Sequence, residues 1–425
     1  MLIKLSNYLF SREFMEVARL DPKHFTRQRT LTLPTVLSFL LSGVQAAVQS
    51  ELDQFFANLR NRADSVREVT AQAFSQARYK INALVFGEVN QELIRLAEEH
   101  LPFPRWKGLR VVAADGSDVR LTMMKDGVRS IVKGMAFGLY LPGIELFLDF
   151  RLHEPLSNER QMFFETIDCL RPDDLLLMDR GFPCRWLVSV LTARHLHFCI
   201  RCYLSRGFMV VREFLRSGQS EQVVVLRAPN ARDAKDYECP ATPTTVRLVR
   251  VVTPNGRIHV VMTSLLDPVA FPAAEFADLY HGRWRIEEAY KRVKHRLQLE
   301  HTSGLSWHAA RQDFGAKAVF DNLNALAAYV ATAAHLDPES LYKINRTLAI
   351  DNIKRQLGRW LLAAQATTRR LKPLLAEIAL NLQKFVQRIR IDRAKPRSDT
   401  FVGRARSGAL GAPSANIFFG FTPKA

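Results

Sequence analysis

Two aspartates stand in settings that favour metal-dependent chemistry. Asp115 follows an apolar run over residues 109–114, and Asp179 follows a second run over 174–178. A carboxylate that ends a buried strand emerges at the rim of the sheet, where the ligands of open α/β sheets bind. Because Asp is also common in ordinary turns, neither residue is conclusive by itself. Asp118 is a competing candidate, but Asp115 ends the apolar run directly.

A third acid lies on a helix that we expect to begin near Ala273. In a helix that turns 100° per residue, a face about 60° wide carries four polar side chains. They are Tyr280, Arg283, Glu287 and Lys294. Such a face suits a site in which the carboxylate binds Mg²⁺ while Arg and Lys bind phosphate oxygens. The alternative is a solvated helix face on which Arg283 and Glu287 form an i,i+4 ion pair.

These residues resemble the motifs of a known family. The spacing Y-x2-R-x3-E-x6-K on the helix resembles the Y-R-E-K signature of the IS-four family of bacterial insertion-sequence transposases. The D-G-S sequence at Asp115 and the D-R-G-F sequence at Asp179 resemble the two aspartate motifs of that family. The resemblance covers most of residues 1–330 and implies an RNase H-like fold and a D-D-E transposase.

The resemblance also implies a mechanism. Asp115, Asp179 and Glu287 would be the catalytic residues and would hold two Mg²⁺ ions, for which Mn²⁺ can substitute. One metal would activate a water, and later the 3′-OH of the transposon, while the other stabilises the leaving oxygen. Such an enzyme binds the terminal inverted repeats of its element, cuts there and joins the 3′ ends to target DNA. Since two ends must meet, we expect a homodimer in a synaptic complex.

Five residues around Glu287 are expected to contact DNA. Arg283 and Lys294 would clamp phosphates, and Tyr280 would contact the backbone near the scissile position. Lys291 is a further expected contact on the same helix. Trp284 lies on the neighbouring face, where it either stacks or, as we favour, packs in the interior.

A second DNA-binding element is predicted nearer the N-terminus. The sequence Ser65-Val66-Arg67-Glu68 has the spacing of a capping box and is expected to open a helix. The polar residues Gln76, Arg78 and Lys80 follow on that helix, which resembles a recognition helix. A solvated polar face remains the alternative.

Composition supports an anionic partner. Lys and Arg number 60 against 42 Asp and Glu, a net charge of +18 on 425 residues. This surplus favours nucleic acid, and 48% apolar residues are enough for a globular core. No secretory signal opens the chain, and the uncharged stretch 30–50 is too polar for a membrane span. We therefore expect a bacterial cytoplasmic protein without membrane contact, associated with the nucleoid when bound to DNA.

The five cysteines do not suggest a disulfide framework. Five is an odd number, and the Cys199-x-x-Cys202 pair has no second pair of candidate ligands for zinc. It also lies in a strand-like run over 197–203. We therefore interpret Cys199 and Cys202 as two half-buried strand thiols and expect a reducing cytosol.

The fold class expected is α/β. Strands are predicted near 109–114, 135–140, 144–152, 174–178 and 197–203, with helices near 160–170 and 185–194. Further strands are expected at 210–211, 222–226, 245–252 and 257–262, with a turn at Pro254-Asn255-Gly256. The predicted regions are an N-terminal helical DNA-binding region (1–100), an RNase H-like core (101–205 and 269–330) interrupted by a β-rich insertion (206–268), and a C-terminal helical region with a basic tail (331–425).

Two other functions remain open. The chain could be a catalytically inactive, transposase-derived DNA-binding protein, although all three acids are present. It could also be a tyrosine recombinase in which Tyr280 is the nucleophile, assisted by Arg283 and His281. That alternative leaves Asp115 and Asp179 without a role.

Overall fold

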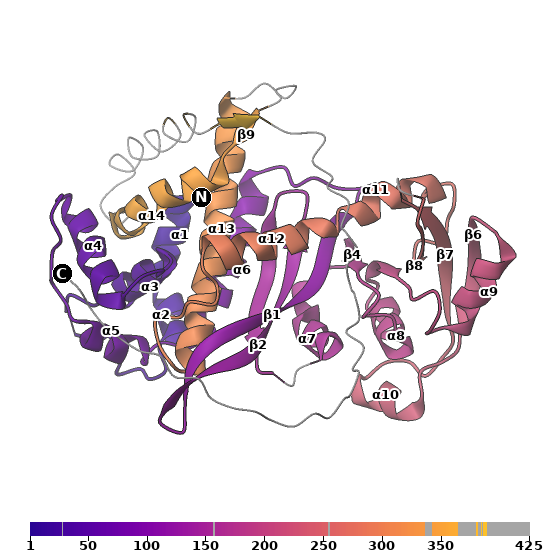
Figure 1. Cartoon of the computed structure of the whole chain (residues 1–425), viewed down its shortest axis with the longest axis horizontal. Helices are drawn as coiled ribbons and strands as arrows, with labels where there is room; N and C mark the ends of the chain where they lie inside the picture. Colours follow the sequence, from indigo (N-terminus) through magenta and orange to yellow (C-terminus); the bar gives the residue numbers. More distant parts are fainter. Residues whose placement is uncertain are drawn as a thin grey trace, which may run out of the picture.

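The computed structural model describes most of the chain. The described residues are 1–27, 29–155, 158–253, 256–335 and 342–363, together with 380, 384 and 386–388. They form a mixed α/β structure in which helices flank one large sheet and the N-terminal helices gather at one end (Figure 1). Most of the predicted C-terminal region 331–425, nearly all of its basic tail, and Pro254 and Asn255 of the predicted turn lie outside the described residues.

Six helices precede the sheet in the described part of the chain. They are α1 (Leu2–Leu9), α2 (Arg12–Ala18), α3 (Leu33–Leu41), α4 (Val48–Arg60), α5 (Ala71–Arg78) and α6 (Val85–His100). Every residue of α3 is buried, which agrees with its uncharged sequence. None of the helices among the described residues is long and apolar enough to cross a membrane.

The predicted capping box at Ser65–Glu68 is wrong. Helix α5 begins later, and its cap is Thr70, whose Oγ1 accepts a hydrogen bond from Ala73 N at 3.1 Å. Glu68 instead accepts a hydrogen bond from Arg60 Nε, at the end of α4, at 2.7 Å. A tertiary ion pair has taken the acid that the capping box would need, so the next hydroxyl residue along the chain caps the helix.

The sheet has eight strands in the order β3-β2-β1-β4-β5-β8-β7-β6. Strands β1, β2 and β3 are antiparallel neighbours, whereas β4 is parallel to β1 and β5 is parallel to β4. The strands are β1 (Arg110–Lys125), β2 (Val128–Leu141), β3 (Leu146–His153), β4 (Asp174–Met178), β5 (His197–Arg201), β6 (Glu221–Leu226), β7 (Thr244–Val252) and β8 (Ile258–Thr263).

Strand β1 does not end at Asp115 as predicted. It pairs with β4 only from Arg110 to Ala114, but it continues along β2 as far as Lys125. Ala114 is the partner of Met178, the last residue of β4. Asp115 and Asp179 are therefore the next residues on two adjacent parallel strands, and they meet at one edge of the sheet.

The region 206–268 extends the same sheet. Strand β8 pairs with β5, and β7 and β6 follow outward. The strands predicted at 222–226, 245–252 and 257–262 are present, but the predicted strand at 210–211 is wrong. Those residues lie in helix α9 (Met209–Ser217), where Val211 and Phe214 are buried. Their i,i+3 spacing gives a helix one apolar face.

The remaining helices lie between the strands or after them in the chain. Those between strands are α7 (Glu159–Thr166) with the 3₁₀ turn η1 (Ile167–Cys169), α8 (Arg185–Ala193) and α10 (Ala231–Asp236). The later elements are η2 (Ala273–Glu275), α11 (Phe276–His281), α12 (Trp284–Arg296), α13 (Trp307–His335), β9 (Tyr342–Ile344), α14 (Arg346–Ala363) and β10 (Val386–Arg388), the last paired with β9. Figure 1 shows α12 running across β1 and α13 between the sheet and the N-terminal helices.

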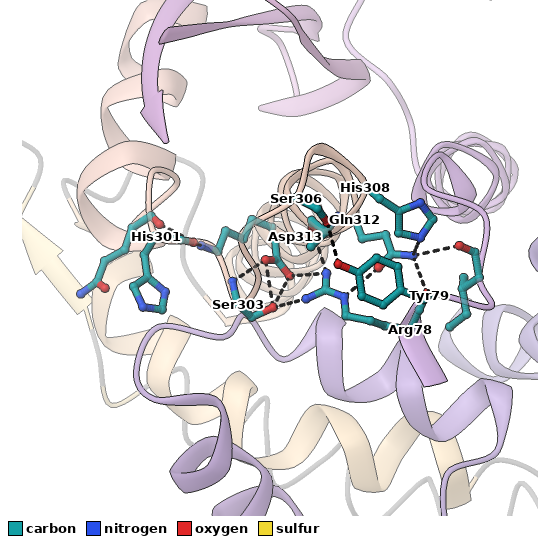
Figure 2. Close-up of polar contacts among 12 residues, drawn as sticks. Arg78, Tyr79, His301, Ser303, Ser306, His308, Gln312 and Asp313 are labelled. Carbon is teal, nitrogen blue, oxygen red and sulfur yellow. Dashed lines mark hydrogen bonds and ion pairs between the residues drawn. The ribbon is translucent and has the colours of Figure 1, made fainter. Parts of the chain in front are cut away.

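A buried arginine ties α5 to α13. The guanidinium of Arg78 donates hydrogen bonds to Gln312 Oε1 at 2.9 Å, Ala309 O at 2.9 Å and Asp313 Oδ1 at 3.0 Å (Figure 2). Arg78 is 1% exposed, so the prediction that it contacts DNA is wrong. It follows the buried Phe74 by four residues and therefore shares its inward face.

We expect Arg78→Ala to lower the free energy of unfolding by about 3–5 kcal/mol, because it leaves the buried Asp313 carboxylate without its cation. The measurement is urea unfolding of the full chain. The matched control is Arg67→Ala, whose ion pair with Asp53 is largely exposed on the arginine side and should be worth about 1 kcal/mol or less. Equal losses for the two variants would contradict a structural role for Arg78.

Candidate active site

Helix α12 lies against the part of β1 that carries Asp115. The hydroxyl of Tyr290 donates a hydrogen bond to the Asp115 carbonyl oxygen at 2.8 Å. One turn further on, Lys294 Nζ donates to Ser117 Oγ at 2.8 Å and also to the carbonyl of Asp118. These contacts fix the register of the helix on the strand, so that Glu287 faces Asp115.

Arg283 stands between these two acids. Its Nη2 donates to Glu287 Oε1 at 2.7 Å, and its Nη1 lies 3.5 Å from Asp115 Oδ2. The i,i+4 ion pair foreseen as an alternative is thus present, but it is not on a solvated face, since Arg283 is 3% exposed. Its Nε and Nη1 are buried without a hydrogen-bond partner among the described residues.

Asp179 is held by the loop that follows β4. The backbone N–H of Gly181 donates to Asp179 Oδ1 at 2.7 Å. Arg160, near the start of α7, donates from Nε to the Gly181 carbonyl at 3.0 Å. The carboxylate is therefore oriented by its own loop, and the loop is anchored by a helix that the sequence did not connect with the site.

The side chain of Tyr280 is buried in the protein interior. It is 4% exposed, and its hydroxyl donates to the carbonyl of Met178 at 3.1 Å. The prediction that it contacts the DNA backbone is therefore wrong, and its observed role is to hold the end of β4 next to Asp179. Burial raises the pKa of Tyr280 above its ordinary value. A buried, hydrogen-bonded phenol of raised pKa is a poor nucleophile, which counts against the tyrosine-recombinase alternative.

The signature residues do not lie on one uninterrupted helix. Helix α11 ends at His281 and α12 begins at Trp284, with i→i+3 hydrogen bonds from Gly282 N to Leu279 O and from Arg283 N to Tyr280 O, both 3.1 Å. This tight turn lies at Gly282, the poorest helix former of the segment. Trp284 is 36% exposed with the Arg283 guanidinium over its ring, so the favoured prediction of interior packing is wrong.

The site gathers negative charge. Burial raises the pKa of Asp115 to about 7; Arg283 opposes the shift, and the carboxylates of Asp179, Glu287 and Glu159 add to it. Sequence reasoning missed Glu159, the first residue of α7, because it lies in a polar stretch far from all three motifs. It also missed Tyr290, whose spacing of one turn from Ile286 and Val293 is typical of core packing.

Carboxylate oxygens are the donors that Mg²⁺ prefers. Within the described residues, however, no group of three Asp, Glu, His or Cys side chains could hold a metal ion as it stands. Between Asp115 and Glu287, the positive charge is supplied by Arg283. The donor chemistry fits a hard divalent ion. Such an ion would favour the ionised form of Asp115, whose pKa is raised first by burial and then by the neighbouring carboxylates. Cys199 and Cys202 are buried free thiols.

The N-terminal helices form a basic cleft. Gln76 and Lys80 line a cavity of about 560 Å³ between α5 and the segment before α3. Five of its lining residues are basic and none of the described ones is acidic. The basic ones are Lys23, His24, Arg27, Arg29 and Lys80. Of the three residues predicted on this helix, two therefore share a positively charged surface, whereas Arg78 does not.

Comparisons with known proteins identify relatives. Residues 106–322 match the family model described as "Transposase DDE domain". The chain is 26% identical over 246 residues to transposase InsG for insertion sequence element IS4 of Escherichia coli (strain K12), an alignment that covers 54% of each protein. It therefore spans about half the length of that relative. The piggyBac transposase in a synaptic complex with hairpin DNA is similar with a TM-score of 0.42 and 9% identity, over 89% of this chain and 85% of that chain.

We expect Asp115→Asn to stabilise the metal-free protein at pH 8 by up to about 4 kcal/mol. A carboxyl whose pKa rises on folding, here to about 7, favours the folded state when protonated and opposes it as pH rises through that value. The gain should therefore shrink between pH 8 and pH 4. It is measured by urea unfolding in EDTA.

The control for this pH series is Asp118→Asn. Asp118 lies on the same strand but is exposed and pairs with Lys133, so its replacement should change stability little at either pH. If Asp115→Asn and the wild type were equally stable at pH 8, the charge repulsion inferred for the site would be absent.

Proposed function

The chain belongs to the DDE transposases of the IS4 family, and we propose that it cuts DNA at the ends of an insertion sequence and joins the 3′ ends to target DNA. One observation carries the proposal. Asp115, Asp179 and Glu287 come from three elements that are far apart in the sequence, yet Arg283 lies 3.5 Å from Asp115 and 2.7 Å from Glu287, and Asp179 and Glu287 both raise the pKa of Asp115.

The proposed fold for this chemistry is RNase H-like. The strands β3, β2 and β1 are antiparallel, and the parallel strands β4 and β5 follow on the side of β1. This arrangement supports the proposal because it places one acid on the central strand and another directly after its parallel neighbour. The third acid then comes from a helix packed on that central strand.

The proposed cofactor is a pair of Mg²⁺ ions, or Mn²⁺ in their place, held by Asp115, Asp179 and Glu287. Bound there, the metals would activate the attacking oxygen and stabilise the leaving oxygen in an in-line displacement at phosphorus. Arg283, which lies between Asp115 and Glu287, would be released to contact a DNA phosphate. Its planar fork of donors suits phosphate oxygens.

Other residues of α12 would meet the DNA backbone. Lys291 is exposed, and Trp284 is partly exposed beside Arg283. Lys294 is held against β1, and burial lowers its pKa. We propose that Lys291 and Trp284 contact DNA directly and that Lys294 steadies the strand that carries Asp115, with its ammonium close to the incoming phosphates.

The basic cleft of the N-terminal helices is the proposed site for the terminal inverted repeats. It offers cations and amides without competing acids among its described lining, which favours phosphate contacts over protein contacts. A homodimer would bring two ends together in a synaptic complex. The setting we propose is the bacterial cytoplasm, on the nucleoid.

We expect Glu287→Gln to lower the rates of metal-dependent end cleavage and strand transfer by at least about 100-fold. Its affinity for the element ends should stay within a few-fold of the wild-type affinity. The assay uses a supercoiled plasmid that carries the DNA flanking the gene, in Mg²⁺ and in Mn²⁺. Glu288→Gln is the matched control, because Glu288 is the exposed neighbour on the same helix. Cleavage by Glu287→Gln at the wild-type rate would remove Glu287 from the proposed site.

The same assay decides between the enzyme and the non-catalytic binder. If the wild-type chain binds the ends tightly but cuts with neither metal, it is a transposase-derived DNA-binding protein. A comparison of the wild type with Tyr280→Phe tests the recombinase alternative. The metal-dependent mechanism predicts that neither protein forms a covalent adduct with DNA. A trapped adduct through Tyr280 in the wild type would overturn the metal-dependent mechanism.

We expect Lys80→Ala to weaken binding to the element ends and to reduce the slope of log K against log salt by about one. Each lysine that contacts a phosphate releases about one counterion when the complex forms. The measurement is fluorescence anisotropy with labelled end DNA over a series of salt concentrations. Lys4→Ala is the control, because Lys4 pairs with Glu99 away from the cleft, and an equal loss of slope there would contradict the assignment.

A further inference from the structure

Two glycines beside the catalytic aspartates make room for another carboxylate. A Cβ added to Gly116 would lie 2.7 Å from Glu159 Oε1, and one added to Gly181 would lie 3.3 Å from Glu159 Oε2 and 3.0 Å from Asp179 Oδ1. Neither glycine has a positive φ, so the backbone conformation does not require them. A glycine inside a strand such as β1 often marks a close approach by another group. Here that group is the carboxylate of Glu159.

Glu159 reaches the site from the opposite face of the sheet. Successive residues of a strand point to opposite faces, and Ser117 contacts Lys294 of α12 while Gly116 adjoins Glu159 of α7. The two helices therefore cover different faces of β1. Strand β4 ends at Met178, so among the described residues β1 has no parallel partner beyond Ala114. Glu159 can approach Asp179 at that position.

The approach of Glu159 is built into the fold. Asn158 caps α7 by accepting a hydrogen bond from Arg160 N at 3.0 Å, and Arg160 Nε donates to the Gly181 carbonyl at 3.0 Å. Glu159 lies between these two residues, so its backbone position is fixed by the contacts of both neighbours. No rearrangement of α7 is needed to bring its first acid to the loop that carries Asp179.

The Glu159 carboxylate has no polar partner within the described part of the chain. Among the described residues, none forms a hydrogen bond or ion pair with the Glu159 carboxylate, although the side chain is partly buried. Burial, Asp179 and Asp118 raise the pKa of Glu159, against the opposing effect of Arg160. A buried charge needs compensation. Within the described ranges, Arg283 Nε and Nη1 are likewise buried without a hydrogen-bond acceptor.

We propose that Glu159 is a fourth carboxylate of the metal site and binds the divalent ion that Asp179 holds. The inference rests on the proposed function and goes beyond it, because the three acids of the family signature do not include this residue. It also gives Gly116 and Gly181 a role, which is to admit an acid from α7.

Binding of Mn²⁺ to the full chain without DNA tests the inference, by isothermal titration calorimetry and by the electron paramagnetic resonance signal of free Mn²⁺. Glu159→Gln should weaken the affinity by about 10-fold or more and should leave the metal-free protein at least as stable. Asp179→Asn should weaken it as well. Glu165→Gln on the same helix is the matched control and should bind like the wild type, because Glu165 lies near His153 instead.

A second variant distinguishes loss of the Glu159 ligand from a general loss of folding. Gly116→Ala should displace the Glu159 carboxylate and weaken Mn²⁺ binding, but it should add nothing in the Glu159→Gln background, because the displaced group is then already lost. Equal effects of Gly116→Ala in both backgrounds would overturn the role given to the glycine cradle and to Glu159.

The outcomes separate this inference from the proposed function. If Glu159→Gln binds Mn²⁺ like the wild type while Asp179→Asn does not, Glu159 is not a ligand and the three-acid site stands. If the wild-type chain binds no Mn²⁺ at all, both the metal site of the proposed function and this inference fail.

Discussion

The parallel pairing of β1 with β4 ends at Ala114 and Met178, and the candidate site depends on that end. Beyond it, β1 keeps its partner β2 and continues, whereas β4 gives way to a loop. The edge that opens between them is where Asp115 and Asp179 emerge side by side. Tyr280 and Tyr290 maintain this geometry by donating hydrogen bonds to the carbonyls of Met178 and Asp115. These bonds position α11 and α12, and α12 carries Glu287.

The site concentrates carboxylates, and Arg283 partly offsets their negative charge. Arg283 is buried between Asp115 and Glu287, and its Nε and Nη1 have no hydrogen-bond partner in the part of the chain that the structure describes. Functional sites commonly store such unfavourable electrostatics, because the same groups bind a charged ligand strongly once it arrives. In the proposed mechanism, a divalent ion would release Arg283 toward a DNA phosphate, and metal binding would then be linked with DNA binding through this side chain.

The N-terminal helices are joined to the catalytic half by polar contacts as well as by apolar packing. Arg78 reaches from α5 to three groups on α13, and Tyr79 stacks on His308 of the same helix (Figure 2). The basic cleft lies on the other side of α5. A DNA end held in that cleft would therefore be positioned relative to α13, and through it relative to the sheet.

The sequence by itself determined the class of the protein and the acids of its signature. The motifs at Asp115, Asp179 and Glu287, the apolar strands and the basic charge are local properties. The α/β class was predicted from the strands and helices, and the DDE family from the resemblance of the motifs. Tertiary structure decided the rest. Arg78 and Tyr280 are of residue types that commonly contact DNA, but both are buried in the fold. Helix α5 is capped by Thr70 and not by Ser65, because Glu68 pairs with Arg60 instead. Glu159 joins the acids only because strand register and two glycines open a path for it, and neither a register nor a gap between elements can be read from residue types along a chain.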